Sequence, residues 1–146
     1  MTDAPPERRD RYRHFRKIQT RWRDNDVYGH VNNVVYYSYF DTVVNAFLIA
    51  AGVLDIARSP VIGLAVESLC RFRKEITYPE TIDAGLRVGH LGRTSVRYEI
   101  GLFREGDDEP AATGYFVHVY VDRKSRKPVP LPAPLRAALT PLLVAS

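Results

Sequence analysis

Residues 24–33 bring together the side chains of this chain that are best suited to chemistry. The segment holds two carboxylates, an imidazole and several amides, at Asp24, Asn25, Asp26, His30, Asn32 and Asn33. A carboxylate can activate a water molecule or attack an acyl carbon directly. A helical pattern begins just after the segment, and free N–H groups at a helix N-terminus can stabilise the oxyanion that such an attack creates. The pattern indicates acyl chemistry, although the same residue types also build purely structural turns and caps.

The helix that follows is predicted to run from about Asn33 to Ala51. Its polar and apolar side chains fall on opposite sides, and the broad apolar side holds Tyr36, Phe40, Val43, Phe47 and Ala50. A broad apolar side indicates a largely buried helix. Asn32 is the predicted N-cap and Gly52 the predicted terminator.

Most of the remaining chain is predicted to form strands. Polar and apolar residues alternate over 15–22, 62–72, 82–88 and 96–102, whereas 113–121 is apolar on both faces; both patterns are typical of strands. A turn is expected at 105–110 and a short helix at about 133–143. An antiparallel sheet of about five strands must bury one face, and one helix is available to cover it. We therefore predict an α+β fold of the hotdog type, a sheet wrapped around one long central helix, with surface left to pair with a second copy.

Length and composition fit a single globular domain. The 146 residues are 45% hydrophobic and 26% charged, as is ordinary for such domains. We expect a flexible N-terminal arm at residues 1–12 and one domain at 13–146. The single cysteine, Cys70, excludes an internal disulfide and a cysteine-based metal cluster, and we expect no metal. No apolar run suits a bilayer span or a signal peptide, so a cytoplasmic protein without membrane insertion is expected.

The charge of the chain does not define a partner by itself. A formal net charge of +4 attracts anions in general. The basic residues are scattered over both ends of the chain and form no recognition motif, so we expect no nucleic-acid binding.

Residues 21–33, followed by Tyr36 and Asp41, resemble a long and specific family signature. The typical pattern is Asp-x-Asp-x-x-Gly-His-Val-Asn-Asn-x-x-Tyr, and it is that of the 4-hydroxybenzoyl-CoA thioesterase-like hotdog family. The similarity extends to residues 72–79, 91–95 and 122–136. It implies an acyl-CoA thioesterase, with no cofactor besides the coenzyme A of the substrate. It also implies a homodimer or homotetramer with sites at the subunit interface.

The resemblance assigns roles to individual residues. Asp26 matches the catalytic carboxylate, which acts as nucleophile or as general base in different members. The oxyanion contact is a backbone N–H at about Asn33. Tyr36 and Phe40 are expected to line the acyl pocket, and Tyr28 to contact the substrate. Plant acyl-carrier-protein thioesterases place a functional asparagine where this chain has Tyr28, so their mechanism is not transferred.

His30 and a basic turn complete the predicted site. His30 could orient the attacking water or simply hold the loop. Coenzyme A carries phosphates that favour cationic contacts, and the turn with Arg93, Thr94 and Ser95 offers a guanidinium and backbone N–H groups for one of them. The competing interpretation is that Arg93 is a solvated turn residue that contacts no phosphate.

Two other functions stay open from the sequence. Hotdog dehydratases and hydratases place aspartate and histidine five apart in an Asp-x-Asn-Pro-x-His run, whereas Asp26 and His30 are four apart with no proline between them. A non-catalytic acyl-CoA binding module would need no carboxylate beside the thioester, and Asp26 in a complete motif argues against it. The sequence does not determine the acyl group. It also does not determine whether the carrier of that group is coenzyme A or acyl carrier protein.

Overall fold

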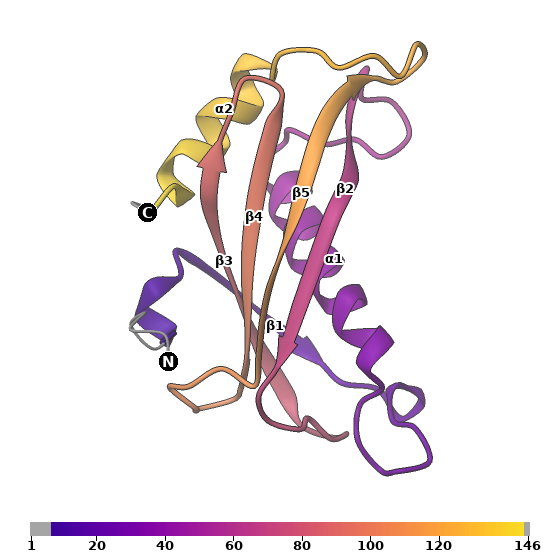
Figure 1. Ribbon diagram of the computed structural model, residues 1–146, viewed down its shortest axis with the longest axis vertical. Helices are drawn as coiled ribbons and strands as arrows, with labels where there is room; N and C mark the ends of the chain where they lie inside the picture. Colours follow the sequence, from indigo (N-terminus) through magenta and orange to yellow (C-terminus); the bar gives the residue numbers. More distant parts are fainter. Residues whose placement is uncertain (1–6, 145–146) are drawn as a thin grey trace.

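The computed structural model describes residues 7–144 and contains one antiparallel sheet of five strands (Figure 1). The strand order is β1-β3-β4-β5-β2. The strands are β1 (His14–Gln19), β2 (Val61–Phe72), β3 (Thr81–Leu91), β4 (Ser95–Arg104) and β5 (Ala112–Asp122). The helices are α1 (Asn33–Ala50) and α2 (Ala133–Leu139), with 3-10 turns at Arg9–Arg11, Trp22–Asp24 and Thr140–Leu142. The five-stranded antiparallel sheet with a helix confirms the predicted α+β class.

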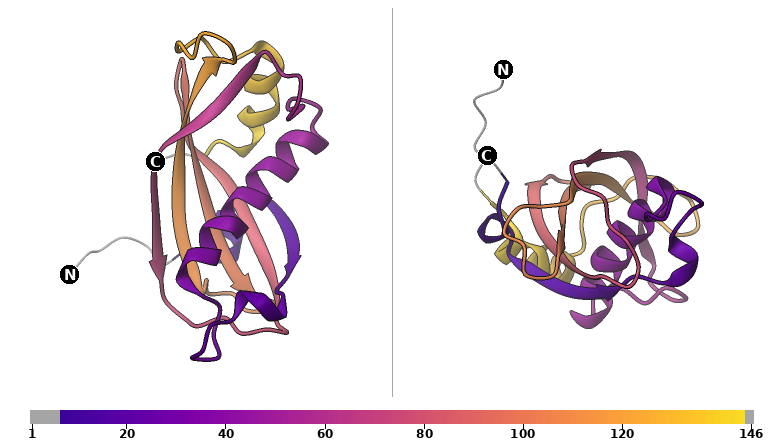
Figure 2. Two further views of the ribbon diagram at one scale, coloured as in Figure 1. Left: turned by 90° about the vertical axis from the view of Figure 1, so that its right-hand side faces the viewer. Right: turned by 90° about the horizontal axis from the view of Figure 1, so that it is seen from below.

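Helix α1 lies diagonally across one face of the sheet (Figure 2). Its buried side chains are Tyr36, Tyr39, Phe40, Val43, Val44 and Leu48. They pack on the alternating apolar residues of β3 and β4, which are fully buried. Each such side chain contributes roughly 1.5–3 kcal/mol when it leaves water. The predicted inclusion of Ala50 was wrong, because Ala50 is exposed, and the buried row continues from Phe40 through Val44 to Leu48 in steps of four residues.

Both predicted ends of α1 are confirmed. The side-chain oxygen of Asn32 accepts a hydrogen bond from the Val34 N–H at 3.0 Å, which satisfies one of the free donors of the first turn. Gly52 follows the helix with a φ of +74°, a left-handed conformation that glycine adopts without a steric penalty. These two signals fix where the helix starts relative to the loop before it.

Strand β1 ends three residues before the predicted boundary at Trp22. Thr20 is buried, and both its N–H and its hydroxyl donate to the Glu80 carbonyl. The chain then turns, because the Asp24 carboxylate accepts a hydrogen bond from the Arg21 N–H at 2.9 Å. Trp22, expected on the strand, is 76% exposed and lies at the start of a 3-10 turn. Local side-chain capping therefore overrides the alternating pattern here.

Strand β2 carries a bulge that the sequence pattern did not reveal. Ala65 lies opposite His118 and Glu67 lies opposite Val117, so β2 contains one extra residue between these two pairs. An extra residue reverses which face the following side chains occupy. The predicted single apolar face over 62–72 is therefore split between the two faces. Strand β2 is also an edge of the sheet, and Leu64, Val66 and Phe72 on it are exposed.

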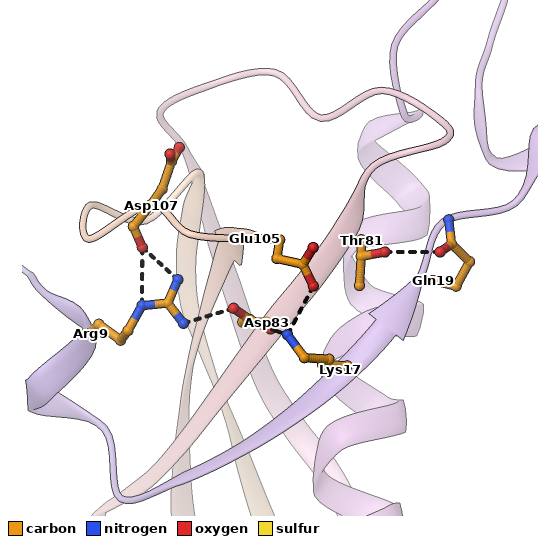
Figure 3. A network of polar contacts seen from close by, with 7 residues as sticks. All are labelled: Arg9, Lys17, Gln19, Thr81, Asp83, Glu105 and Asp107. Atoms are coloured by element: carbon orange, nitrogen blue, oxygen red, sulfur yellow. Dashed lines mark hydrogen bonds and ion pairs between the residues drawn. The ribbon is translucent and has the colours of Figure 1, made fainter.

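Residues 7–12, part of the expected flexible arm, pack against the face of the sheet opposite α1. Tyr12 is buried over Gly85 and Gly101, and a Cβ at Gly101 would lie 2.7 Å from the Tyr12 ring. Arg9 donates to Asp83 at 2.8 Å and to the Asp107 carbonyl (Figure 3). The remainder of the expected arm, residues 1–6, lies outside the described residues.

The C-terminal segment closes one end of the sheet. The proline-rich stretch 128–134 runs along the end of β5, where Val129 N–H donates to the Tyr120 carbonyl at 3.0 Å. Helix α2 then buries Leu135 and Leu139. Across residues 7–144, no helix is long and apolar enough to span a bilayer, and no cluster of histidine, cysteine and acidic side chains could hold a metal ion.

Candidate active site

Asp26 lies in a short turn that its own side chain stabilises. Its carboxylate accepts a hydrogen bond from the Tyr28 N–H at 2.9 Å, an aspartate-type turn. Its N–H donates to the His30 carbonyl, and its carbonyl accepts from the Gly29 N–H, both at 3.0 Å. Gly29 has a φ of +84°, which closes the turn at little cost. The turn holds the Asp26 carboxylate half-buried at the mouth of a cavity.

Asp24, the other carboxylate of the segment, anchors the turn to the helix. It is 2% exposed and accepts hydrogen bonds from the Tyr39 hydroxyl at 2.7 Å and from the Arg21 guanidinium at 3.0 Å. Its backbone carbonyl accepts from the Asn32 N–H. Burial raises the pKa of Asp24, but the hydrogen bonds from Tyr39 and Arg21 outweigh it and hold the pKa below its ordinary value. Asp24 is therefore a buried anchor of the loop.

The cavity beside Asp26 has a volume of about 510 Å³. One wall is the loop and the start of α1, and the other is the end of β2 with the residues just after it. The lining residues are Asp26, Tyr28, His30, Val31, Asn32, Asn33, Tyr36, Phe72, Arg73, Lys74 and Glu75. The size falls in the range of ligand pockets.

The N-terminus of α1 opens into this cavity. Asn33 is the first helical residue and is exposed. The Asn32 side chain occupies the neighbouring Val34 N–H, whereas the Asn33 N–H donates to no described residue. A free N–H with the partial positive charge of a helix end is suited to stabilise an oxyanion. Asp26 and Asn33, both assigned through the family signature, therefore line one cavity.

Of the three residues predicted to contact the substrate, two line the cavity and one does not. Tyr28, which is 82% exposed, and Tyr36, which is 2% exposed, both line the cavity. Tyr36 packs edge-on against Phe72 at 5.0 Å between ring centroids. Phe40 does not line the cavity: it is fully buried against Phe116. It lies one turn further along α1 than Tyr36, where the helix has already entered the core.

His30 pairs with Glu75, a residue to which the sequence analysis assigned no role. Its Nε2 lies 2.8 Å from the Glu75 carboxylate. Glu75 follows Arg73 and Lys74, and all three come after the last residue of β2. Arg73 forms no ion pair or side-chain hydrogen bond with any residue in 7–144, so its guanidinium is available to an anion. A basic pair at the end of a long strand was the available sequence signal, but only a tertiary contact places it beside the loop, where the Val31 N–H donates to the Ile76 carbonyl at 2.7 Å.

Arg93, Thr94 and Ser95 lie at the opposite end of the sheet from Asp26. Arg93 and Thr94 lie in the turn between β3 and β4, and Ser95 is the first residue of β4, whereas the loop with Asp26 contacts residues just before β3 begins (Figure 1). The eleven residues of β3 span about 36 Å. Helix α2 and the proline-rich stretch before it hold the turn. The Arg136 guanidinium donates to the Gly92 carbonyl, and the Leu131 N–H donates to the Arg93 carbonyl. One copy of the chain does not bring this turn to the cavity.

An antiparallel sheet with α1 across one face is the architecture of the hotdog fold. A model of the thioesterase-like superfamily matches residues 20–139. The chain therefore belongs to the thioesterase-like superfamily.

Comparisons with individual proteins agree with this assignment. The crystal structure of the PA5185 protein of Pseudomonas aeruginosa is 51% identical, with a TM-score of 0.94, over 97% of this chain and 99% of that one. The PA2801 protein of the same species, described as a candidate thioesterase, is 29% identical with a TM-score of 0.82, over 88% and 99%. The YsmA protein of Bacillus subtilis is 26% identical over 116 residues, which are 79% of this chain and 77% of that one.

Proposed function

We propose that the protein hydrolyses an acyl-CoA thioester to a free acid and coenzyme A. The observation that carries the proposal is the shared cavity: the Asp26 carboxylate and the free N–H of Asn33 line the same space of about 510 Å³. Membership of a thioesterase superfamily supports it. Thioester hydrolysis needs a base or nucleophile, an oxyanion donor and room for an acyl group, and this cavity offers a candidate for each.

The chemistry follows from the placement of these groups. With the thioester carbonyl oxygen directed at the Asn33 N–H, the Asp26 carboxylate removes a proton from water, and the water oxygen attacks the carbonyl carbon. Collapse of the oxyanion breaks the C–S bond, and the thiolate of coenzyme A leaves and takes up the proton. If Asp26 attacks instead, it forms a mixed anhydride that water then cleaves. The His30–Glu75 pair holds the loop and faces the same cavity.

Recognition of coenzyme A phosphates needs cations near the cavity mouth. Within one copy, Arg73 supplies one. We propose that the turn with Arg93, Thr94 and Ser95 reaches the cavity of a second copy. Strand β2 is an edge with exposed apolar side chains, which favours pairing with another edge. Antiparallel pairing of two β2 strands would set the start of one beside the end of the other, and thereby bring the turn of one copy toward Asp26 of its partner.

Free-thiol release from short, long and aromatic acyl-CoAs tests the proposal. Asp26→Asn should lower the rate at least 100-fold, because the amide can neither accept the water proton nor attack, while coenzyme A binding stays nearly unchanged. Asp10→Asn is the matched control, since Asp10 is exposed on the opposite side of the sheet and should leave the rate unchanged.

Two results would redirect the proposal. Rapid release that survives in Asp26→Asn would remove Asp26 from the reaction. Tight coenzyme A binding without release from any acyl-CoA would favour a binding module or an acyl-carrier-protein substrate. Light scattering of the same samples reports whether the chain is a dimer or tetramer, and a monomer that turns over would refute the role given to the second copy.

A further inference from the structure

A second cavity, which we call the far cavity, lies between the C-terminal end of α1 and the start of β2. Its volume is about 280 Å³. A neighbouring hollow of about 410 Å³ adjoins it, and the residues common to both walls are Val53, Leu54, Val61, Pro132 and Leu135. This end of α1 therefore carries a sizeable space whose shared wall is entirely apolar.

The far cavity suits a hydrocarbon and no charged group. No charged side chain lines it, and burial lowers the pKa of His118 to about 4, so that imidazole is neutral at physiological pH. The Tyr120 hydroxyl in its wall already shares a hydrogen bond of 2.5 Å with the Tyr98 hydroxyl. An ion would lose its hydration here without compensation, whereas a hydrocarbon would leave water favourably.

The far cavity is out of reach of Asp26 in the same copy. Asn45, on its helix wall, lies twelve residues after Asn33, or about 18 Å along the helix. Between these two positions Phe40 is fully buried and packs edge-on against Phe116 at 5.8 Å between ring centroids. Core side chains therefore fill the direct path between the two cavities of one copy.

A second copy offers the shorter path. In the antiparallel pairing of β2 strands proposed above, the start of one strand lies beside the end of the other. Val61 and Gly63, at the start of β2, line the far cavity, and Phe72, the last residue of β2, lines the cavity beside Asp26. A two-fold axis repeats this arrangement at both ends of the paired strands. Each cavity beside Asp26 would thus adjoin the far cavity of the other copy.

We propose that the far cavity of one copy receives the hydrocarbon tail of an acyl group whose thioester is bound at Asp26 of the partner subunit. The substrate class is then an aliphatic acyl thioester with a tail that extends beyond the first cavity, where Arg73, Lys74 and Glu75 make much of the wall polar. The inference rests on the proposed thioester hydrolysis and on the proposed pairing of β2. Each methylene that leaves water contributes about 0.8 kcal/mol, a factor of about four.

Thiol release from butyryl-CoA and decanoyl-CoA tests the proposal, because only the longer tail reaches the far cavity. The wild type should have the higher kcat/KM for decanoyl-CoA. Leu54→Trp places an indole in the far cavity, and expulsion of two methylenes should lower the ratio of decanoyl to butyryl kcat/KM about fifteen-fold. Leu54→Ala enlarges the cavity and should shift the preference toward dodecanoyl-CoA, a gain that misfolding does not produce. Leu143→Trp is the matched control, since Leu143 is 41% exposed and does not line the far cavity.

A mixed dimer tests whether the tail crosses to the partner. One copy carries Asp26→Asn with an open far cavity, and the other carries Leu54→Trp with an intact Asp26. The two copies are co-expressed with different affinity tags and purified through both. The mixed dimer should hydrolyse decanoyl-CoA at about half the wild-type rate, because one of its two symmetric sites joins an intact Asp26 to an open far cavity. Each of the two parent homodimers should hydrolyse it far more slowly.

The possible results separate this inference from the proposed function. Absence of thiol release from every acyl-CoA would refute the hydrolysis itself, and the inference with it. Release with the same decanoyl to butyryl ratio in wild type and Leu54→Trp would refute only the role of the far cavity. A mixed dimer that hydrolyses butyryl-CoA but not decanoyl-CoA would show that the tail stays within its own copy, which would overturn the proposal.

Discussion

Lowering the pH from about 7 to about 4 should destabilise the folded protein through His118 in particular. Burial of its ring lowers the pKa from the ordinary 6.5 to about 4. The folded state therefore resists protonation over this window while the unfolded state binds a proton. Stability that is fully present above pH 6.5 is lost as the pH falls toward 4. The gap of about 2.5 units corresponds to about 3 kcal/mol at 1.36 kcal/mol per unit, a large share of the 5–15 kcal/mol typical of such a domain.

The assay is urea unfolding at several pH values between these limits, at one protein concentration. The wild type should lose about 3 kcal/mol more than His118→Phe over the window, because the variant has no imidazole to protonate. His90→Gln is the matched control, since His90 is exposed, and it should follow the wild type. Nuclear magnetic resonance titration gives the pKa of His118 directly. Equal pH slopes in wild type and His118→Phe, or a His118 titration near 6.5, would refute the reasoning.

Three further predictions concern helix α1, the loop before it and strand β2. Asn32→Ala removes the cap of α1 and should cost about 1 kcal/mol in urea unfolding, whereas Asn32→Ser should restore most of it. Tyr39→Phe leaves buried Asp24 without one donor and should cost about 1–3 kcal/mol; an unchanged midpoint would show that water replaces the hydroxyl. Burial raises the pKa of Cys70 from 9.0 to about 11, so its alkylation by iodoacetamide at pH 8 should be about 100-fold slower in the folded than in the unfolded chain, and equal rates would contradict its burial.

The sequence by itself determined the local features whose signals are short in range. The cap at Asn32, the terminator at Gly52 and the alternation of β3 and β4 are set by neighbours within a few residues. The resemblance to the family signature singled out Asp26, and its catalytic role stays a proposal.

Tertiary structure decided what depends on distant partners. The bulge in β2 arises from pairing with β5, and no pattern within β2 marks it. Tyr12 packs over two glycines of the sheet, so residues 7–12 are ordered although their own sequence is polar. Phe40 lies in the core and Arg73 lines the cavity beside Asp26. Both placements follow from how α1 and the end of β2 pack in the folded chain. The burial of His118 likewise follows only from the packed tertiary structure.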